Sequence, residues 1–210
     1  MSRALDVGRQ LCEAVAYLHR QGVVHRDLKP QNIIVDAVGG VHIIDFGISL
    51  DRTARRITWG GLSALLGTPE YMAPEQVLGK RGDARTDVYA LGTILYEMLS
   101  GSLPYSARDA STLMHLKLRE GPGHLKEVAE HLDPALAEAI MHALAREPSE
   151  RYPDVGILLD VLNNPLKGLA WEKPTPKWHE SLATRFGPQF VGFGVVGAAL
   201  AGVFFAAAHH

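Results

Sequence analysis

Two short polar motifs in the first quarter of the sequence carry side chains that could move a phosphoryl group. Residues 25–32 read HRDLKPQN, and the tripeptide DFG follows at residues 45–47. Phosphoryl transfer needs a carboxylate that orients a hydroxyl nucleophile and oxygen ligands that hold Mg²⁺. Asp27 and Asp45 provide two carboxylates, and Asn32 provides an amide oxygen. Lys29 provides a cation for the transferred phosphate. Either motif alone could be a chance polar turn, but the two together favour a phosphate-handling site.

The elements around these motifs are predicted to bring them together. Apolar residues recur at helical spacing between residues 5 and 18, and Gly22 follows where a helix would end. The β-rich runs 32–35 and 41–44 are joined by turn-forming residues, which predicts a β-hairpin. Because a hairpin reverses the chain, it would return the second motif to the side of the first.

The remainder of the chain is predicted to be mainly helical. Residues 45–75 show no periodicity and are rich in Gly, Ser, Thr and Arg, which is typical of a functional or mobile connection. Further helices are expected at 87–99, which is apolar on nearly every face, at 107–120, at 134–145 behind an Asp133 cap, and at 154–162.

These motifs, in this order, resemble those of the protein kinase superfamily. Residues 67–75 read GTPEYMAPE and resemble the segment that closes a kinase activation loop. Residues 87–92 read DVYALG and resemble the start of the central buried helix. Arg151 lies where kinases place the arginine that pairs with the glutamate matched here by Glu75. The resemblance covers Arg3 to Leu162 and looks closest to the eukaryotic-like serine/threonine kinases of bacteria.

The resemblance implies a fold, an activity and a set of site residues. The fold is α+β and protein kinase-like, and residues 1–162 form its C-terminal lobe only, mostly α-helical with a small β-hairpin. The activity is transfer of the ATP γ-phosphate to serine or threonine hydroxyls of protein substrates, with Asp27 as the catalytic base. Lys29 together with Thr68 favours serine and threonine over tyrosine. Lys29 is implied to contact the γ-phosphate, and Ile34 is implied to lie under the adenine ring. Asn32 and Asp45 are implied to hold magnesium.

Two further roles follow from the same resemblance. His25 and Phe46 would stack in the internal hydrophobic column. Arg26 precedes the catalytic aspartate, which in this family goes with control by phosphorylation of the activation loop, since an arginine can order a loop around a phosphate. The candidate acceptor hydroxyls are Thr53, Thr58 and Ser63. The resemblance also allows for a dimer of two such lobes.

No glycine-rich phosphate lid, lysine-bearing strand or partner glutamate precedes the first helix in this sequence. Because both lobes of a kinase must normally be in place for turnover, we expect an upstream lobe to bind most of the ATP. Residues 192–197 fit G-x-G-x-x-G, but they lie inside an apolar run without a following lysine, so we interpret them as coincidence. The alternative function is a membrane-anchored, kinase-like binding module without turnover.

Composition excludes some classes of partner and compartment. Net charge is −2, so no basic excess drives binding to nucleic acid. Cys12 is the single cysteine, which fits a reducing cytosol. Charged residues interrupt the first 20 residues, which argues against a signal peptide.

The C-terminal part of the sequence predicts a membrane anchor. Residues 163–189 contain four prolines and read as a juxtamembrane linker. Phe190 to Ala208 is a run of nineteen residues without charge, close to the roughly 20 that a transmembrane helix needs. Basic residues lie before the run rather than after it, which predicts a single pass through the inner (plasma) membrane with the kinase lobe in the cytoplasm. The alternative is a buried C-terminal helix.

Overall fold

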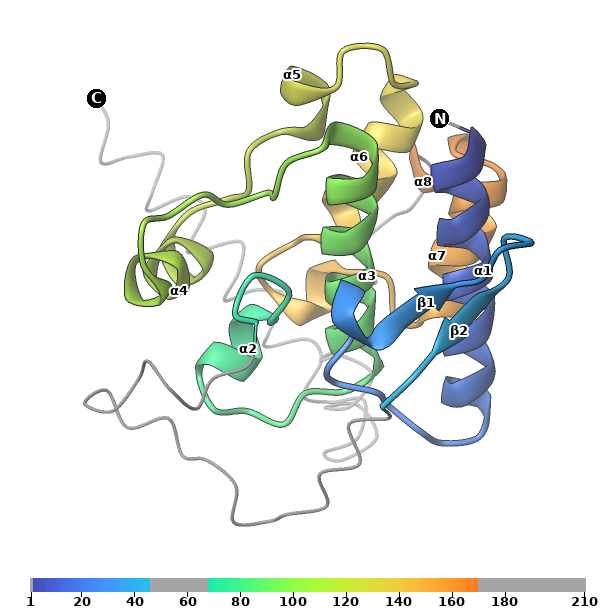
Figure 1. Ribbon diagram of the computed structural model, residues 1–210. Coiled ribbons are helices and arrows are strands. Elements are labelled where there is room, and N and C mark those ends of the chain that lie inside the picture. The colour runs from blue at the N-terminus through green and yellow to red at the C-terminus, as the bar shows by residue number, and fades with distance from the viewer. Residues whose placement is uncertain (1, 46–67, 170–210) are drawn as a thin grey trace, which may run out of the picture. The chain divides into compact units, whose positions relative to one another are not determined.

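The computed structural model describes residues 2–45 and 68–169. In this part of the chain, helices surround one long central helix, and a small two-stranded sheet lies at one side (Figure 1). The elements in chain order are α1 (Ser2–Arg20), η1 (Pro30–Asn32), β1 (Ile33–Val35), β2 (Val41–Ile43), α2 (Pro74–Val77), α3 (Ala84–Ser100), α4 (Ala110–Arg119), α5 (Leu125–Val128), α6 (Pro134–Ala143), η2 (Pro148–Glu150), α7 (Val155–Asn163) and α8 (Leu166–Leu169).

The first helix forms on the apolar spacing seen in the sequence. Leu11 and Val15 are buried on the face of α1 that packs against α3 and α7. The chain leaves the helix at Gly22, whose φ of 76° is a left-handed conformation that glycine adopts without steric cost. The predicted helix is confirmed, and it extends back to Ser2.

The predicted hairpin is confirmed and is antiparallel. Ile33 pairs with Ile43 and Val35 pairs with Val41. The carboxylate of Asp36 closes the turn by accepting hydrogen bonds from the main-chain N–H groups of residues 38 and 40 at 3.0 and 2.7 Å. The inward-facing side chains of the hairpin pack against the hydrophobic core, which fixes the hairpin on the domain.

Helix α3 is the centre of the described domain. Asp83 caps its first turn by accepting from the N–H of Arg85, and Gly101, with a φ of 73°, ends it. Most of its residues are buried, as the apolar sequence of 87–99 predicts. Gly92 allows close contact with α6, since a Cβ built at this position would lie 3.0 Å from the Cβ of Ala143.

The other predicted helices are present with shifted ends. Helix α6 begins after Asp133, whose carboxylate accepts from two N–H groups of the first turn. Helix α4 begins at Ala110 rather than at residue 107, because Asp109 is the residue that caps it. Helices α2, α5 and α8 were not predicted. Each has four residues, which is too short for a periodic pattern.

The membrane prediction concerns residues 190–208, which lie outside the described residues. Within residues 2–45 and 68–169, no helix combines the length and the apolar character that a membrane crossing requires. Of the predicted linker 163–189, only residues 163–169 are described, and they include α8.

Candidate active site

A buried carboxylate holds the main chain of the first polar motif. Asp87, near the start of α3, is fully buried and accepts hydrogen bonds from the N–H groups of His25 at 2.8 Å and Arg26 at 2.7 Å. The ring Nε2 of His19 lies 2.8 Å from the same carboxylate. These contacts hold Arg26 at a φ of 65°, a left-handed conformation that costs a non-glycine residue free energy. The loop is therefore fixed before any ligand binds.

Burial lowers the pKa of His25, although the carboxylates of Asp87, Asp27 and Asp45 act in the opposite direction. Its Nδ1 accepts a hydrogen bond from the N–H of Asp27 at 3.3 Å. An acceptor at Nδ1 requires that this nitrogen carry no proton, which fits a histidine whose pKa is lowered. His25 thus supports the loop from inside, whereas the stacking with Phe46 that was expected for it involves a residue outside the described part of the chain.

The structure brings Asp27, Lys29 and Asn32 together. The Nζ atom of Lys29 lies 2.7 Å from Oδ2 of Asp27. The side-chain amide of Asn32 donates to the main-chain oxygen of Asp27 at 2.9 Å and to its Oδ2 at 3.3 Å. The Asp27 side chain is about 50% exposed, so its carboxylate can still reach a substrate hydroxyl. Asn32 itself is buried.

Asp45 lies at the end of the hairpin nearest Asn32. The N–H of Ile44 donates to the main-chain oxygen of Asn32 at 2.9 Å, which extends the strand pairing by one step. Asp45 follows with a φ of 58° and is exposed. The hairpin therefore places the second carboxylate beside the first motif, as the sequence predicts.

The donor set of Asn32 and Asp45 fits a magnesium ion that also binds phosphate. Mg²⁺ prefers oxygen ligands and is usually held by one or two carboxylates together with substrate phosphates and water. Because the amide nitrogen of Asn32 donates to Asp27, its amide oxygen is left for a cation. Within the described residues there is no cluster of three or more His, Cys, Asp or Glu side chains that could hold a metal by itself.

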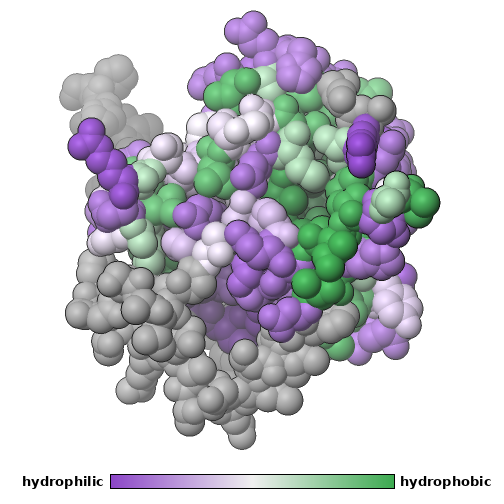
Figure 2. Space-filling view, in the orientation of Figure 1, coloured by the Kyte–Doolittle hydropathy of each residue, from purple (hydrophilic) through white to green (hydrophobic). Residues whose placement is uncertain are grey.

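The outer face of the hairpin is open and carries apolar side chains beside the exposed His42. Ile34 and Ile44 lie on this face, with 48% and 41% of their surfaces exposed. Figure 2 shows apolar side chains gathered over β1 and β2 beside polar ones. Exposed aliphatic side chains can pack against a planar ring, and the expected contact of Ile34 with adenine stays a prediction.

Gln76 joins the first motif to the segment that contains residues 68–75. Its side-chain nitrogen donates to the main-chain oxygen of Arg26 at 2.8 Å, and its side-chain oxygen accepts from the N–H of Ala73 at 2.9 Å. Sequence reasoning did not identify Gln76 or the role of Asp87. An acidic residue in a helix that is otherwise apolar was the available signal for Asp87.

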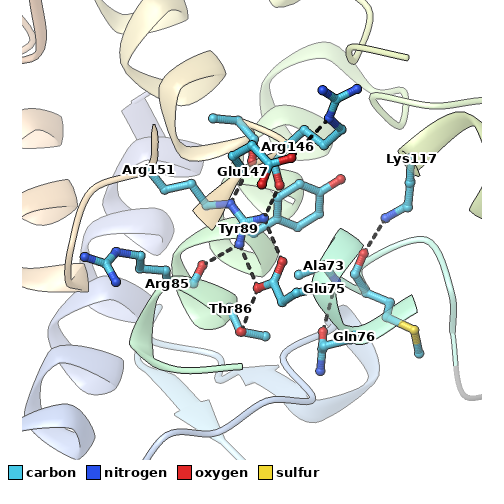
Figure 3. A network of polar contacts seen from close by, with 12 residues as sticks. Ala73, Glu75, Gln76, Arg85, Thr86, Tyr89, Lys117, Arg146, Glu147 and Arg151 are labelled. Atoms are coloured by element: carbon cyan, nitrogen blue, oxygen red, sulfur yellow. Dashed lines mark hydrogen bonds and ion pairs between the residues drawn. The ribbon is translucent and has the colours of Figure 1, made fainter. Parts of the chain in front are cut away.

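The expected pair of Glu75 and Arg151 is present and buried (Figure 3). Two guanidinium nitrogens of Arg151 each lie 2.8 Å from one carboxylate oxygen of Glu75. The hydroxyl of Thr86 donates to Glu75 at 2.8 Å, and the guanidinium lies 4.8 Å from the ring centre of Tyr89. Burial acts to raise the pKa of Glu75, but the hydrogen bonds and charge of Arg151 outweigh it and the pKa is lowered.

Several predicted residues lie outside the described part of the chain. These are Phe46 and Gly47 of the second motif and the candidate phosphorylation sites Thr53, Thr58 and Ser63. Among the described residues, Asp27, Lys29, Asn32, Ile34 and Asp45 lie on one continuous loop and hairpin, as the sequence indicated.

A family model and several known proteins match most of the chain. The family model of the protein kinase domain matches residues 2–162. The serine/threonine-protein kinase PknB of Mycobacterium tuberculosis is 38% identical over 155 residues, which are 71% of this chain and 24% of that protein. The serine/threonine-protein kinase PknD of Chlamydia caviae is 33% identical over 191 residues, which are 83% of this chain and 20% of that protein. The chain thus spans about a quarter of the length of these relatives, or less.

Proposed function

The chain belongs to the protein kinase family, and from that membership we propose that it carries the catalytic loop of a serine/threonine protein kinase. The observation that carries the proposal is the cluster of Asp27, Lys29 and Asn32 beside Asp45. The reaction is transfer of the γ-phosphate of ATP to a serine or threonine hydroxyl of a protein. The names of the relatives support the choice of hydroxyl.

Asp27 would orient the attacking hydroxyl. Its carboxylate is half exposed and held by Lys29 and Asn32, so it can accept a hydrogen bond from a hydroxyl without moving its own main chain. The hydroxyl oxygen bonds to the γ-phosphorus, and the bond from that phosphorus to the β–γ bridging oxygen breaks. The bridging oxygen keeps the electron pair and leaves with ADP, while the hydroxyl proton passes to Asp27.

The other residues would stabilise charge and hold ATP. The ammonium of Lys29 would shift from Asp27 toward the γ-phosphate, where negative charge is spread over the oxygens. Asn32 and Asp45 would hold magnesium, which neutralises phosphate charge when bound. Ile34, with the neighbouring Ile44, would support the adenine ring from below.

Arg26 supports a proposal about regulation. Its Nε finds no hydrogen-bond partner among the described residues, although Nη1 donates to the main-chain oxygen of Val24. Burial, and then the charge of Arg81, lower the pKa of Arg26. Two neighbouring cations favour an anion, so we propose that Arg26 binds a phosphate on the activation loop. Thr53, Thr58 and Ser63 are the candidate carriers.

We also propose that residues 190–208 span the inner membrane once, with residues 1–162 in the cytoplasm. The support is the uncharged run and the basic residues before it. A dimer of two kinase lobes is part of the same proposal, because a shared membrane confines the copies to two dimensions.

The test of the kinase proposal compares wild type with Asp27→Asn, each joined to an upstream ATP-binding lobe. The assay measures transfer of radiolabelled phosphate from Mg·ATP to a mixture of serine and threonine peptides. We expect the variant to lose about 10²- to 10⁴-fold of the rate, since a carboxamide cannot accept the proton. Its melting temperature should stay close to that of wild type, because the carboxylate is half exposed. Equal rates would show that Asp27 is not the base. No transfer by the wild type would favour the binding-module alternative.

A further inference from the structure

A lysine of α4 is completely buried and contacts the segment next to the active site. Lys117 has no exposed surface, although lysine is rarely buried in full. Its Nζ donates to the main-chain oxygen of Glu70 at 2.6 Å and to that of Met72 at 2.8 Å. Lys117 follows Glu70 by 47 positions and Met72 by 45, so the contact joins two distant parts of the domain.

The surroundings of the amine are built to receive it. Nζ lies 5.1 Å from the ring centre of Tyr89 on α3 and 5.8 Å from that of Tyr105, which precedes α4. Two carbonyl oxygens and two aromatic faces are the partners that an ammonium or amine prefers in a dry site. Figure 3 shows Lys117 directed at the segment that leads into Glu75 and Gln76.

This arrangement costs free energy that a leucine or methionine would not cost. Burial opposes the charged amine, and a simple apolar side chain could fill the same space. In compensation, the hydrogen bonds from Lys117 satisfy the main-chain carbonyls of residues 70 and 72 and hold them in place. On the other side of the same segment, Gln76 binds the carbonyl of Arg26, next to Asp27.

We propose that Lys117 is a positioning residue that latches residues 70–72 to α4 and so sets the surface on which a protein substrate lies against Asp27. The proposal rests on the proposed function, because it takes residues 68–75 as the segment that receives the substrate. Lys117 acts through a contact inside the domain and does not itself touch the reacting atoms.

The latch is expected to respond to pH. Burial lowers the pKa of Lys117 to about 7, while the carboxylate of Glu70 raises it and the charge of Arg151 lowers it further. The other titratable groups that face the amine are the two hydroxyl-bearing rings, Tyr89 and Tyr105, and burial raises the pKa of each.

The direction follows from proton binding in the two states. An undocked, solvated lysine has a pKa near 10.5, so between about pH 7 and 10.5 it binds more protons than docked Lys117 does. Acid therefore favours release of residues 70–72, and docking strengthens as the pH rises. Between pH 8.5 and 6.5 we expect the open fraction to increase on the order of tenfold.

Amide hydrogen exchange on the 210-residue chain tests the latch without any turnover. We compare wild type with Lys117→Met and with the matched control Lys126→Met, because Lys126 also donates to two main-chain oxygens but on α5. At pH 8.5, Lys117→Met should lower the protection of the amides of residues 70–73 about tenfold, since two hydrogen bonds are lost. The control should leave these amides as in wild type.

The pH profile is the measurement that a purely space-filling role would not change. After correction for intrinsic exchange, protection of residues 70–73 should fall on the order of tenfold from pH 8.5 to 6.5 in wild type and stay constant in Lys117→Met. Amides of α1 serve as the internal reference. Unchanged protection in Lys117→Met, or the same profile in both proteins, would overturn the proposal. If the variant does not fold, a flat wild-type profile alone overturns it.

The outcome is separable from the proposed function. A chain that transfers no phosphate can still show the latch by exchange, and a kinase without the latch can still transfer phosphate. Loss of protection in the 210-residue chain, with no peptide phosphorylation by the chain joined to the upstream lobe, would therefore refute the kinase proposal and keep the latch as a structural contact. Phosphorylation with a flat exchange profile would do the opposite.

Discussion

Replacing Arg151 by methionine should destabilise the domain more than most single substitutions. The guanidinium is buried and makes two hydrogen bonds to Glu75. It also donates to the main-chain oxygens of Ala145 at 2.7 Å, Arg146 at 2.9 Å and Arg85 at 3.1 Å. Methionine is also long and unbranched but has no donor, so all five acceptor atoms on the four partner residues lose a hydrogen bond.

The magnitude comes from the charge that remains behind. The Glu75 carboxylate is about 7% exposed and would keep no cation in place of Arg151 among its partners in the described residues, although the Thr86 hydroxyl would still donate to it. Removing one member of a buried ion pair costs about 3–5 kcal/mol, because the other charge stays buried and uncompensated. For a domain of this size, that loss corresponds to a drop in melting temperature of roughly 6–20 °C.

Urea denaturation followed by circular dichroism measures this loss. Arg85→Met is the matched control, since Arg85 pairs with Asp83 on the surface and such pairs contribute about 0–1 kcal/mol. If Arg151→Met lost less than about 1 kcal/mol, or no more than the control, the reasoning from buried charge would be wrong.

Three further predictions concern acid, packing and the membrane. The pKa of Glu75 is lowered in the folded state, so its contribution to stability is present above about pH 4.5 and is lost as the pH falls further; urea midpoints between about pH 5 and 3 should fall more steeply for wild type than for Glu75→Gln. Gly92→Val should cost roughly 1–3 kcal/mol in the same assay, because a Cβ there lies 3.0 Å from Ala143, and a neutral effect would show that α3 and α6 can separate. Deleting residues 190–210 should move the protein from the membrane fraction to the soluble fraction, since nineteen helical residues span about 28 Å; an intact chain that is soluble without detergent would contradict the anchor.

The sequence predicted those elements that depend on local chemistry. Asp133 followed by Pro134 marks the start of α6, and the turn residues between β1 and β2 mark the hairpin, because a cap and a tight turn are each encoded within a few residues. The proximity of Asp27, Lys29, Asn32 and Asp45 was predictable for the same reason. Their separation in the chain is short, and the hairpin alone is enough to bring them together.

Contacts between distant segments were not predictable from spacing. The pair of Glu75 and Arg151 is separated by 76 residues and was expected only through the resemblance to kinases. Lys117 reads in the sequence as an ordinary solvated cation on an amphipathic helix, since nothing local indicates that residues 70–72 cover it. The contact of Gln76 with Ala73 is a local capping contact, but its contact with the carbonyl of Arg26, 50 positions earlier, gives no local signal.

The loop of residues 25–32 takes its geometry from α3, most of whose residues are buried. Asp87 holds the loop that carries Asp27, and the preceding residue, Thr86, binds Glu75 at the base of the segment beside it. Gln76 then joins that segment to the loop directly. Three stretches far apart in the chain are thus tied to one another through side chains that also belong to the core.

This arrangement explains how an unfavourable main-chain conformation can persist next to Asp27. A left-handed residue such as Arg26 costs on the order of 1 kcal/mol and survives only where its neighbours over-determine it. Here the N–H of Arg26 binds Asp87 and its carbonyl oxygen binds Gln76, so both sides of the residue are fixed. Asp45 shares the left-handed conformation but is exposed at the end of the hairpin. The main chain before Asp27 is therefore set by the fold, whereas the proposed function leaves the exposed Asp45 carboxylate to be completed by metal and nucleotide.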